Sequence, residues 1–341
     1  MRKALREIEM EYGIPSTTLR AAIHRNILKA EKVGGIRMVD DESASFKEYL
    51  SNYRSQAKRD GLTAADGTEK GVARMAYTGE TRNGITLGLC NQKGGVGKTS
   101  TVAALAAIYA GQGLRVLVVD NDPQGNVSLQ LGVDALGQSD MRTVADLYLG
   151  KIQALEAAVS TSIEGLDLVP ATVDLARVEM MLPTQQGSDL RLKSALKEAR
   201  EQYDIILFDS PPNLGKLSIN VLAASDWFLI PISGAWSVRS VDVILEKAED
   251  NRRFYNTQSQ FLGLVITMME RTKVMNSLRE YNQENFAQYL LDTSIRRATL
   301  AREAEAMATP IPLYAEDSAI AEDYRNLAEE VATRIGLTVP A

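Results

Sequence analysis

The sequence predicts an α/β protein built on a doubly wound, mostly parallel sheet. From residue 84 to the end of the chain, short apolar runs alternate with longer helical segments. The runs at 115–121 and 205–208 are almost continuously apolar, which is typical of strands that helices cover on both faces. A glycine-rich loop lies between the first such strand and the first helix, as expected for this fold class.

The expected elements follow in order from the strand at 85–90, and each strand is a short apolar run between longer helical stretches. We expect further strands at 115–121, 166–170, 205–208, 227–231 and 261–268. We expect helices at 99–111, 173–181, 188–202, 216–224, 238–251, 277–291 and 319–335.

The glycine-rich loop has the composition of a phosphate-binding loop. Residues 91–100 read Asn-Gln-Lys-Gly-Gly-Val-Gly-Lys-Thr-Ser. Glycines let backbone N–H groups point at phosphate oxygens, Lys98 adds a positive charge near the β and γ phosphates, and the Thr99 hydroxyl can bind Mg²⁺. The predicted nucleotide-binding residues are Lys93, Gly94, Gly95, Val96, Gly97, Lys98, Thr99, Ser100, Asp122 and Asp209.

The loop departs from the usual phosphate-loop spacing at one position. A glycine is expected five residues before Gly97, but Gln92 stands there and is followed by a second lysine, Lys93. A lysine held so close to its own loop can be directed toward a nucleotide that a second copy of the chain binds. The loop therefore predicts a homodimer.

Two further strands end in carboxylates. The segment after one strand reads Asp-Asn-Asp-Pro-Gln-Gly-Asn and places Asp120 and Asp122 in a turn, while the strand at 205–208 ends at Asp209. In an open parallel sheet, such strand ends surround the metal and the attacking water beside a phosphate loop. For Asp120 a purely structural role, at a strand end or helix cap, is an equally good interpretation.

These three segments together resemble the ParA family of deviant Walker-type partition ATPases, which is related to MinD, over about residues 85–336. The resemblance implies a P-loop NTPase fold, ATP and Mg²⁺ as cofactors, and slow ATP hydrolysis stimulated by a ParB-like centromere-binding protein. It implies that Lys93 acts across an ATP-bound homodimer and that Lys98 and Thr99 hold phosphate and Mg²⁺. It also implies that Asp122 positions the hydrolytic water, and that Asp122 and Asp209 contact Mg²⁺ through water. Lys93, Lys98 and Asp122 are thus the expected catalytic residues.

Composition excludes several other classes. The chain has 341 residues, 45% of them apolar, which is enough for a substantial core. No Asn-Lys-x-Asp run for guanine is present, so ATP is favoured over GTP. Cys90 is the only cysteine, which excludes intrachain disulfides and the bridging cluster of the nitrogenase iron protein. No signal peptide or run of eighteen apolar residues is present, so we expect a cytoplasmic, nucleoid-associated protein.

Residues 1–50 are predicted to form a small winged helix-turn-helix domain, joined by a linker at 51–83 to an ATPase domain at 84–341. Residues 1–39 hold eight Lys and Arg against four Asp and Glu, although the whole chain has a net charge of −6. Helices are expected at 3–12 and 16–25, followed by a hairpin wing at 28–39. This pattern resembles excisionase and MerR-type proteins. The alternative is a small helical cap that packs on the ATPase or mediates dimerisation.

Two sets of residues are predicted to contact DNA. In the first domain, operator-specific contacts are expected from Ser16, Thr17, Arg20, Arg25, Lys29, Lys32 and Arg37. In the ATPase domain, the resemblance implies sequence-independent contacts of the ATP dimer from Arg271, Arg296 and Arg297. The usual Pro-Arg-Asn-Val-Arg of the family is replaced here by Ile-Arg-Arg-Ala-Thr at 295–299. The alternative for these arginines is a solvated helix face paired with Glu303 or Glu305.

Three functions compete at this stage. The first is a plasmid or chromosome partition ATPase whose leading domain also represses its own operon. The second is a MinD-like membrane-patterning ATPase, which requires a basic, amphipathic C-terminal helix. The expected helix at 319–335 carries Glu322, Asp323, Glu329 and Glu330 instead, so membrane binding is not expected. The third is a positioning ATPase for another cargo.

Overall fold

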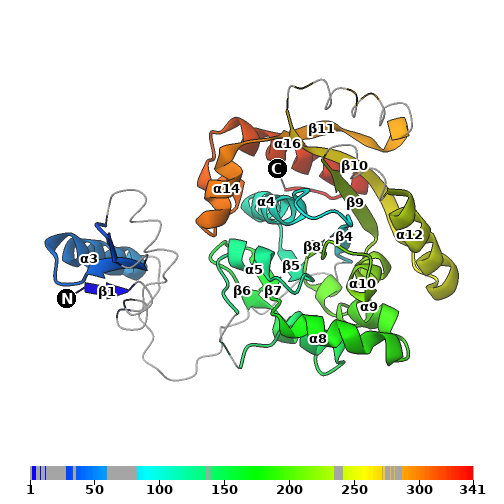
Figure 1. Ribbon diagram of the computed structural model, residues 1–341, viewed down its shortest axis with the longest axis horizontal. Helices are drawn as coiled ribbons and strands as arrows, with labels where there is room; N and C mark the ends of the chain where they lie inside the picture. Colours follow the sequence, from blue (N-terminus) through cyan, green and yellow to red (C-terminus); the bar gives the residue numbers. More distant parts are fainter. Residues whose placement is uncertain are drawn as a thin grey trace. The chain divides into compact units, whose positions relative to one another are not determined.

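The computed structural model describes residues 2–4, 8, 12, 28–33, 36–59, 83–135, 138, 140–233, 241–270, 272, 277, 280 and 286–340. The chain divides into two compact units, Met1–Thr78 and Gly79–Ala341 (Figure 1). In the described part of the chain, no helix combines the length and the apolar content needed to span a membrane.

The second unit is built on one sheet, which has eight strands within the described residues. Their order is β11-β10-β9-β4-β8-β5-β7-β6, and every neighbouring pair is parallel except β6 and β7. The strands are β4 Ile85–Leu89, β5 Val116–Asp120, β6 Val159–Ser160, β7 Leu166–Val169, β8 Ile205–Asp209, β9 Trp227–Ile232, β10 Gln260–Met269 and β11 Leu290–Arg296. The predicted mostly parallel α/β sheet is confirmed.

Helices cover both faces of this sheet, as expected for strands that are buried throughout. The α-helices are α4 Lys98–Gly111, α5 Asn126–Gln130, α6 Val144–Tyr148, α7 Ala154–Ala157, α8 Asp174–Met181, α9 Arg191–Ala195, α10 Lys216–Ala224, α12 Val241–Tyr255, α14 Thr299–Ala306, α15 Ile311–Tyr314 and α16 Ala319–Ile335. The 3₁₀ helices are η1 Leu182–Thr184, η2 Ser188–Leu190, η3 Ala199–Glu201 and η4 Ala287–Tyr289. Helices α4 and α16 share one core with the sheet, and α6, α8, α9, α10 and α12 share the other (Figure 1).

Two of these helices show how local sequence sets the boundaries. Helix α4 is rich in alanine, which favours helix formation, and it is buried along most of its length against the sheet and α16. Helix α16 begins where the Ser318 hydroxyl accepts a hydrogen bond of 3.3 Å from the N–H of Ala321. It ends at Gly336, whose φ of 70° suits glycine.

The structure differs from two of the predicted helices in this unit. The expected helix at 188–202 is broken into η2, α9 and η3. The expected helix at 277–291 is wrong at its end, because Leu290 begins the edge strand β11, and the short helix α14 follows. Leu290, Leu291 and Ile295 bury their side chains against the sheet and its helices, and this long-range packing overrides the helical pattern.

The first unit contains a three-stranded antiparallel sheet and a helix. Its elements are β1 Arg2–Ala4, β2 Glu31–Val33, β3 Ile36–Asp40 and α3 Ala44–Arg59, with strand order β1-β3-β2. The buried side chains of Ile8, Leu28, Val39 and Phe46 form its core.

The winged helix-turn-helix prediction is not supported by these elements. Arg2–Ala4 is a strand that pairs with β3, so the predicted helix does not begin at Lys3. The predicted helix at 16–25 lies outside the described residues, and of the predicted helix at 3–12 the described residues Ile8 and Tyr12 are helical. The predicted hairpin is present as β2 and β3. Helix α3 also continues past residue 50, the predicted end of the domain, to Arg59.

Candidate nucleotide-binding site

The glycine-rich loop connects β4 to α4 at the carboxyl edge of the parallel sheet. Gly95 and Gly97 have φ values of 70° and 81°, a left-handed conformation that other residues rarely adopt. Gly97 directly precedes α4, so the loop ends at a helix N-terminus whose free N–H groups favour anions. This geometry suits a phosphate group.

Contacts with two neighbouring strands, β9 and β10, hold the loop in place. The Asn91 side chain donates to the carbonyl of Pro231 at 2.8 Å and accepts from the N–H of Lys93 at 2.9 Å. The Thr267 hydroxyl, on β10, lies 2.8 Å from the carbonyl of Val96. Sequence analysis missed both residues, although the position of Asn91 between strand and loop could have indicated it.

Lys98 lies inside this loop. Its side chain is only 6% exposed, and its Nζ donates to the carbonyls of Asn91 at 3.1 Å and Lys93 at 3.4 Å. Burial lowers the pKa of the Lys98 ammonium, and the nearby charge of Asp209 opposes this shift. The ammonium group is thus fixed at the centre of the loop.

Lys93 differs from Lys98 in its surroundings. It is exposed, and its Nζ donates to the carbonyl of Ser233 at 2.9 Å, just after β9. A lysine at the rim of the loop, rather than at its centre, remains accessible to a second molecule.

The predicted carboxylates gather at the ends of β5 and β8. Asp120 and Asp209 are register partners on these adjacent strands, and both are fully buried. The hydroxyl of Thr99 donates to Asp209 Oδ2 at 2.7 Å. Burial, with the charge of Asp120 beside it, raises the pKa of Asp209 to about 8.

Asp120 and Asp122 have different partners. Asp120 Oδ2 accepts from the N–H of Ser128 at 3.0 Å and from its hydroxyl at 2.6 Å, so this carboxylate ties β5 to α5. Burial raises the pKa of Asp120 to about 6. Asp122 is 6% exposed and accepts from the N–H of Gln124 at 3.0 Å, which orders the turn after β5. Asp120 thus has the contacts of a structural residue.

Thr99, Asp122 and Asp209 together offer hydroxyl and carboxylate oxygens, the ligands that Mg²⁺ prefers in proteins. The buried Lys98 ammonium lies beside them, where it can compensate phosphate charge. The residues present therefore fit a magnesium–nucleotide complex.

Glu179 is a further residue that sequence analysis missed. It lies on α8, and its carboxylate approaches the start of α10 so closely that a side chain at Gly215 would collide with it. Burial and the charge of Asp122 raise the pKa of Glu179, and the N–H of Leu217 has the opposite effect. Its place at the site could not be predicted from the spacing of residues in the sequence, because α8 and α10 come together only in the folded chain.

Most of the predicted DNA contacts are not visible in the structure. Ser16, Thr17, Arg20, Arg25 and Arg271 lie outside the described residues, as do the side chains of Lys32 and Arg37. Lys29 is exposed.

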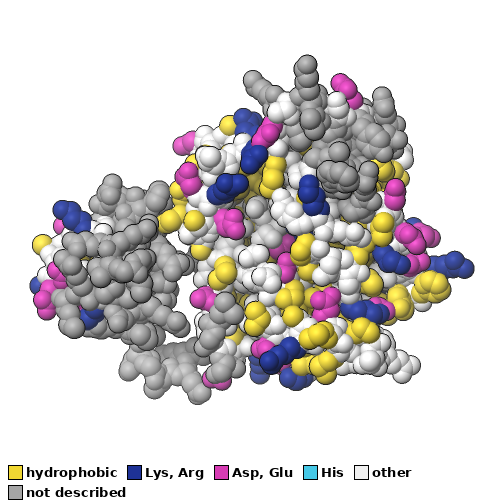
Figure 2. Space-filling view, in the orientation of Figure 1, with side chains coloured by type: hydrophobic (Ala, Val, Ile, Leu, Met, Phe, Trp, Pro, Cys, Tyr) yellow, Lys and Arg dark blue, Asp and Glu magenta, His cyan; other side chains and the backbone are white. Residues whose placement is uncertain are grey.

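The two arginines at the end of β11, Arg296 and Arg297, form ion pairs. Arg296 makes two hydrogen bonds of 2.7 Å to the carboxylate of Asp323, and Arg297 contacts Glu270 at 2.5 Å. Neither arginine pairs with Glu303 or Glu305 as the alternative interpretation predicted. On the face shown in Figure 2, Lys and Arg side chains of the described residues are dispersed among acidic ones.

Exposed apolar side chains gather around α8. Val173 is 60% exposed, Met180 74% and Met181 50%. Figure 2 shows hydrophobic side chains concentrated over the lower part of this face, where α8 runs in Figure 1. Exposed apolar side chains that gather in this way are typical of interaction sites.

The parallel sheet, the glycine loop that opens a helix, the buried lysine and the Thr–Asp pair define a P-loop nucleotide-binding protein. Comparison with known proteins agrees with this class. The AAA domain family matches residues 85–261. Soj, the sporulation initiation inhibitor protein of Bacillus subtilis, is 36% identical over 252 residues, which cover 73% of this chain and 98% of that protein. The chromosome partitioning protein ParA of Caulobacter vibrioides is 35% identical over 256 residues, covering 73% and 94%. The chain belongs to the ParA/Soj family of partition ATPases.

Solved structures support the same fold. The cobyrinic acid a,c-diamide synthase of Mycobacterium smegmatis, with bound ATP analog and magnesium, matches with a TM-score of 0.64 at 30% identity over 76% of this chain and 99% of that one. The septum site-determining protein MinD of Pyrococcus horikoshii, complexed with Mg-ADP, has a TM-score of 0.61 at 24% identity, covering 74% and 97%.

Proposed function

We propose that this chain is an ATP-dependent DNA partition ATPase that dimerises on ATP, binds DNA without sequence preference, and hydrolyses ATP slowly until a ParB-like centromere-binding protein stimulates it. The observation that supports this most is the pair of unlike lysines in one loop. Lys98 is buried at the centre of the loop, and Lys93 is exposed at its rim. A chain that binds one nucleotide by itself requires only the buried lysine, Lys98.

The chemistry follows from the positions of these residues. Lys98 and the backbone N–H groups of the loop would hold the phosphates, and Thr99 and Asp209 would hold Mg²⁺, the latter through water. Mg²⁺, when bound, neutralises phosphate charge. Asp122 would accept a hydrogen bond from the attacking water and orient it, and would contact Mg²⁺ through a further water.

Dimerisation is supported by a second feature. The exposed apolar side chains of Val173, Met180 and Met181 lie on and beside α8, whose Glu179 reaches the loop before α10 at the nucleotide site. Burying such a surface in a dimer is favourable by about 25 cal/mol per Å² of apolar area. A face-to-face dimer would bring Lys93 of each copy to the triphosphate of the other.

The DNA functions rest on the relatives and on charge. Two matched relatives are named for chromosome partitioning, and this supports a role on the nucleoid in the cytoplasm. We assign operator binding and autorepression to the first unit, where basic residues are in excess and Lys29 is exposed. The acidic Glu322 and Glu329 on the exposed face of α16 make this helix a poor anchor for an anionic membrane.

The test separates nucleotide binding from dimerisation. With a non-hydrolysable ATP analogue and Mg²⁺, light scattering should give a dimer mass for the unchanged chain. Lys98→Ala should lose nucleotide binding and the dimer, whereas Lys93→Ala should bind nucleotide and remain monomeric. Lys193→Ala, an exposed lysine on α9, is the matched control and should dimerise normally. A dimer of unchanged mass in Lys93→Ala would refute the proposal.

The choice of DNA over membrane is tested separately. Pelleting with DNA and with anionic liposomes, each with and without ATP, should recover the protein with DNA only in the presence of ATP. Recovery with liposomes instead would favour the MinD-like alternative.

A further inference from the structure

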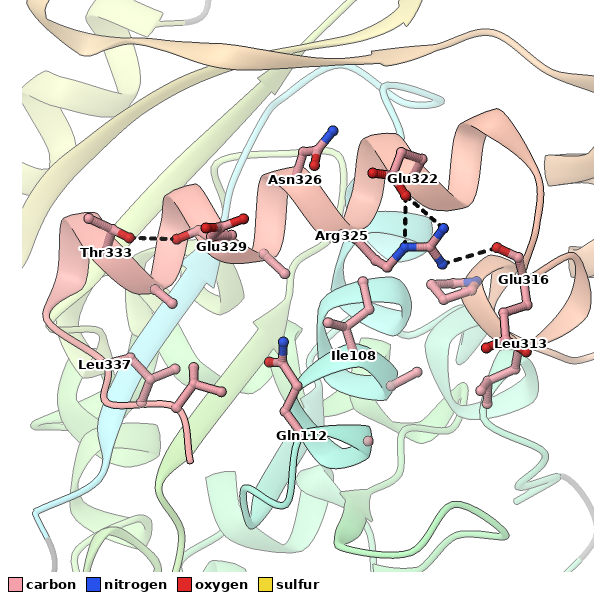
Figure 3. Close-up of a pocket in the computed structure, with 16 residues that line it drawn as sticks. Ile108, Gln112, Leu313, Glu316, Glu322, Arg325, Asn326, Glu329, Thr333 and Leu337 are labelled. Carbon is pink, nitrogen blue, oxygen red and sulfur yellow. Dashed lines mark hydrogen bonds and ion pairs between the residues drawn. The ribbon is translucent and has the colours of Figure 1, made fainter. Parts of the chain in front are cut away.

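A groove lies in the second unit far along α4 from the phosphate loop (Figure 3). It encloses about 790 Å³ between α4, α15, α16 and the chain after Gly336. Helix α4 begins at the phosphate-loop residue Lys98, whereas Gln112, just after its other end, lines the groove. At about 1.5 Å per residue, Ala107, the lining residue of α4 nearest to the loop, is about 14 Å along the helix from Lys98, and Gln112 is about 20 Å from it. The groove is therefore separate from the nucleotide site.

One wall of the groove is a stripe along α16. Glu322, Arg325, Asn326, Glu329 and Thr333 recur at spacings of three and four residues, so they share one face of the helix. Figure 3 shows these side chains in a row above the groove. The stripe runs for about 17 Å, which is the length of three turns of a second helix.

The opposite wall is apolar. Ile108 comes from α4, Leu313 from α15, and Leu337 and Val339 from the segment after α16. Leu313 is 49% exposed, a large fraction for a leucine within a groove. Apolar side chains of a ligand would be removed from water when they contact this wall, which is favourable.

Charge in the groove is unbalanced. Three lining side chains are acidic, Glu316, Glu322 and Glu329, and only Arg325 is basic. Arg325 is already engaged, because it donates to Glu322 at 2.8 and 3.0 Å and to the carbonyl of Glu316 at 3.0 Å. Among the described residues, the carboxylates of Glu316 and Glu329 have no such cation. An incoming positive charge would therefore be attracted.

We propose that this groove binds a basic, amphipathic helical segment of a partner protein. Leucine-type side chains of the segment would pack on Leu313 and Leu337, and its Lys or Arg side chains would pair with Glu316 and Glu329. A free polyamine would satisfy the carboxylates but leave the apolar wall uncovered. A neutral apolar segment would leave the carboxylates without cations. The two walls together select the amphipathic segment.

The proposal is tested with the full chain and two fluorescent model peptides of fifteen residues. One has leucine on one helical face and lysine on the other, and the second has glutamate in place of lysine. Anisotropy should show binding of the lysine peptide only, weakened by salt. The double variant Glu316→Lys, Glu329→Lys should weaken binding by about tenfold or more, because two attractions become repulsions.

The matched control is the double variant Glu198→Lys, Glu201→Lys, which changes net charge equally at two exposed glutamates elsewhere. It should change affinity by less than about twofold. Equal weakening by both double variants would mean unspecific attraction and would overturn the proposal. Leu313→Gln should also weaken binding, and an unchanged affinity would identify the groove as a polyamine site instead.

A second measurement needs no substitution. Hydrogen exchange of the unchanged chain should slow in α15, in the segment after α16 and at the end of α4 when the lysine peptide is added. Protection confined to other elements would overturn the proposal even if the charge variants do not fold.

Discussion

The Thr99 hydroxyl donates a hydrogen bond of 2.7 Å to Asp209 Oδ2, which joins the first turn of α4 to the end of β8. These two residues are 110 positions apart in the sequence, and parallel pairing of β4 with β8 brings them together. Both groups offer oxygen atoms to Mg²⁺, the Thr99 hydroxyl directly and the Asp209 carboxylate through water. The hydrogen bond thus marks the metal position in the proposed nucleotide complex.

Thr99→Val should therefore remove the effect of Mg²⁺ on nucleotide binding. Valine keeps the shape of threonine but has no oxygen to offer a metal. Calorimetric titration of ATP with and without Mg²⁺ should give affinities that differ strongly in the unchanged chain and by less than about twofold in the variant. Thr333→Val, on the exposed face of α16, is the control and should behave as the unchanged chain. Retention of the full magnesium effect in Thr99→Val would contradict the assignment.

Asp122→Ala should separate hydrolysis from binding. Asp122 is nearly buried at the end of β5 and has no ion pair among the described residues, so its loss removes a hydrogen-bond acceptor for water. Positioned proton acceptors typically contribute about 10²–10⁴ in rate, so kcat should fall by about 100-fold or more. Nucleotide affinity should change little. Asp174→Ala, an exposed residue of α8, should leave the rate unchanged, and a similar loss there would point to a general effect on folding.

Much of the site could be predicted from sequence because its residues lie at strand ends next to glycines. The loop at 91–100 and the carboxylates at 120, 122 and 209 follow apolar runs, so their meeting at one edge follows from parallel pairing. Asn91, Thr267 and Glu179 were missed for the opposite reason. Asn91 contacts Pro231, 140 positions away, and Thr267 contacts Val96, 171 positions away. No local pattern encodes such contacts.

The edges of the fold were predicted less well than its centre. Central strands such as β5 and β8 are buried on both faces and read as apolar runs. Strand β11 pairs on one side only and reads Leu-Leu-Asp-Thr-Ser-Ile-Arg, so its polar residues hide the strand pattern. In the first unit, β1 has three residues and is defined by its pairing with β3. Short edge strands depend on tertiary pairing more than on propensity.

Glu179→Ala should weaken the start of α10 and slow hydrolysis. The alanine variant leaves the N–H of Leu217, near the start of α10, without the carboxylate that it faces, and a lost hydrogen bond costs about 0.5–1.5 kcal/mol, so the melting temperature should fall by about 1–3 °C. The loop before α10 begins at Asp209, so kcat should fall more than KM changes. Glu179→Gln keeps the shape and should restore part of the rate. A rate equal to that of the unchanged chain would assign Glu179 a role in stability alone.

The first unit should lose stability in acid through Asp41. The Asp41 carboxylate pairs with Lys3 Nζ at 2.6 Å and accepts from the Tyr12 hydroxyl at 3.0 Å. The Lys3 hydrogen bond holds the pKa of Asp41 well below its ordinary value of 3.8. Because the folded pKa is lowered, this stabilisation is present above pH 3.8 and is lost as the pH falls below it.

The measurement requires a signal from the first unit alone. Fluorinated phenylalanine at Phe46, in the core of this unit, would report folded and unfolded populations by ¹⁹F NMR in urea. The urea midpoint of the unchanged chain should fall between pH 5 and pH 3. Asp41→Asn should have a lower midpoint at pH 5 and a weaker dependence on pH. Equal slopes for the two chains would show that other groups control the acid response.

Arg296 and Arg297 should differ when each is replaced by alanine. Arg296 makes two side-chain hydrogen bonds to Asp323, and its backbone N–H also donates to Asp323 at 2.9 Å, so this arginine fastens β11 to α16. Arg297 and its partner Glu270 are both more than 40% exposed, and such surface pairs contribute about 0–1 kcal/mol. Arg296→Ala should therefore lower the melting temperature by about 2 °C or more, while Arg297→Ala should leave it nearly unchanged.

The two variants should have the opposite ranking in DNA binding. Arg297 is weakly held in the folded chain, so it exchanges its carboxylate partner for a phosphate at little cost in free energy. Affinity for DNA of random sequence, measured at several salt concentrations with ATP, gives a slope of log affinity against log salt. Each lost phosphate contact reduces this slope by about 0.9. Arg297→Ala should reduce it by about that amount, and Arg296→Ala should reduce it less. A slope unaffected by Arg297→Ala would remove this arginine from the DNA-binding surface and leave its contact with Glu270 as its only role.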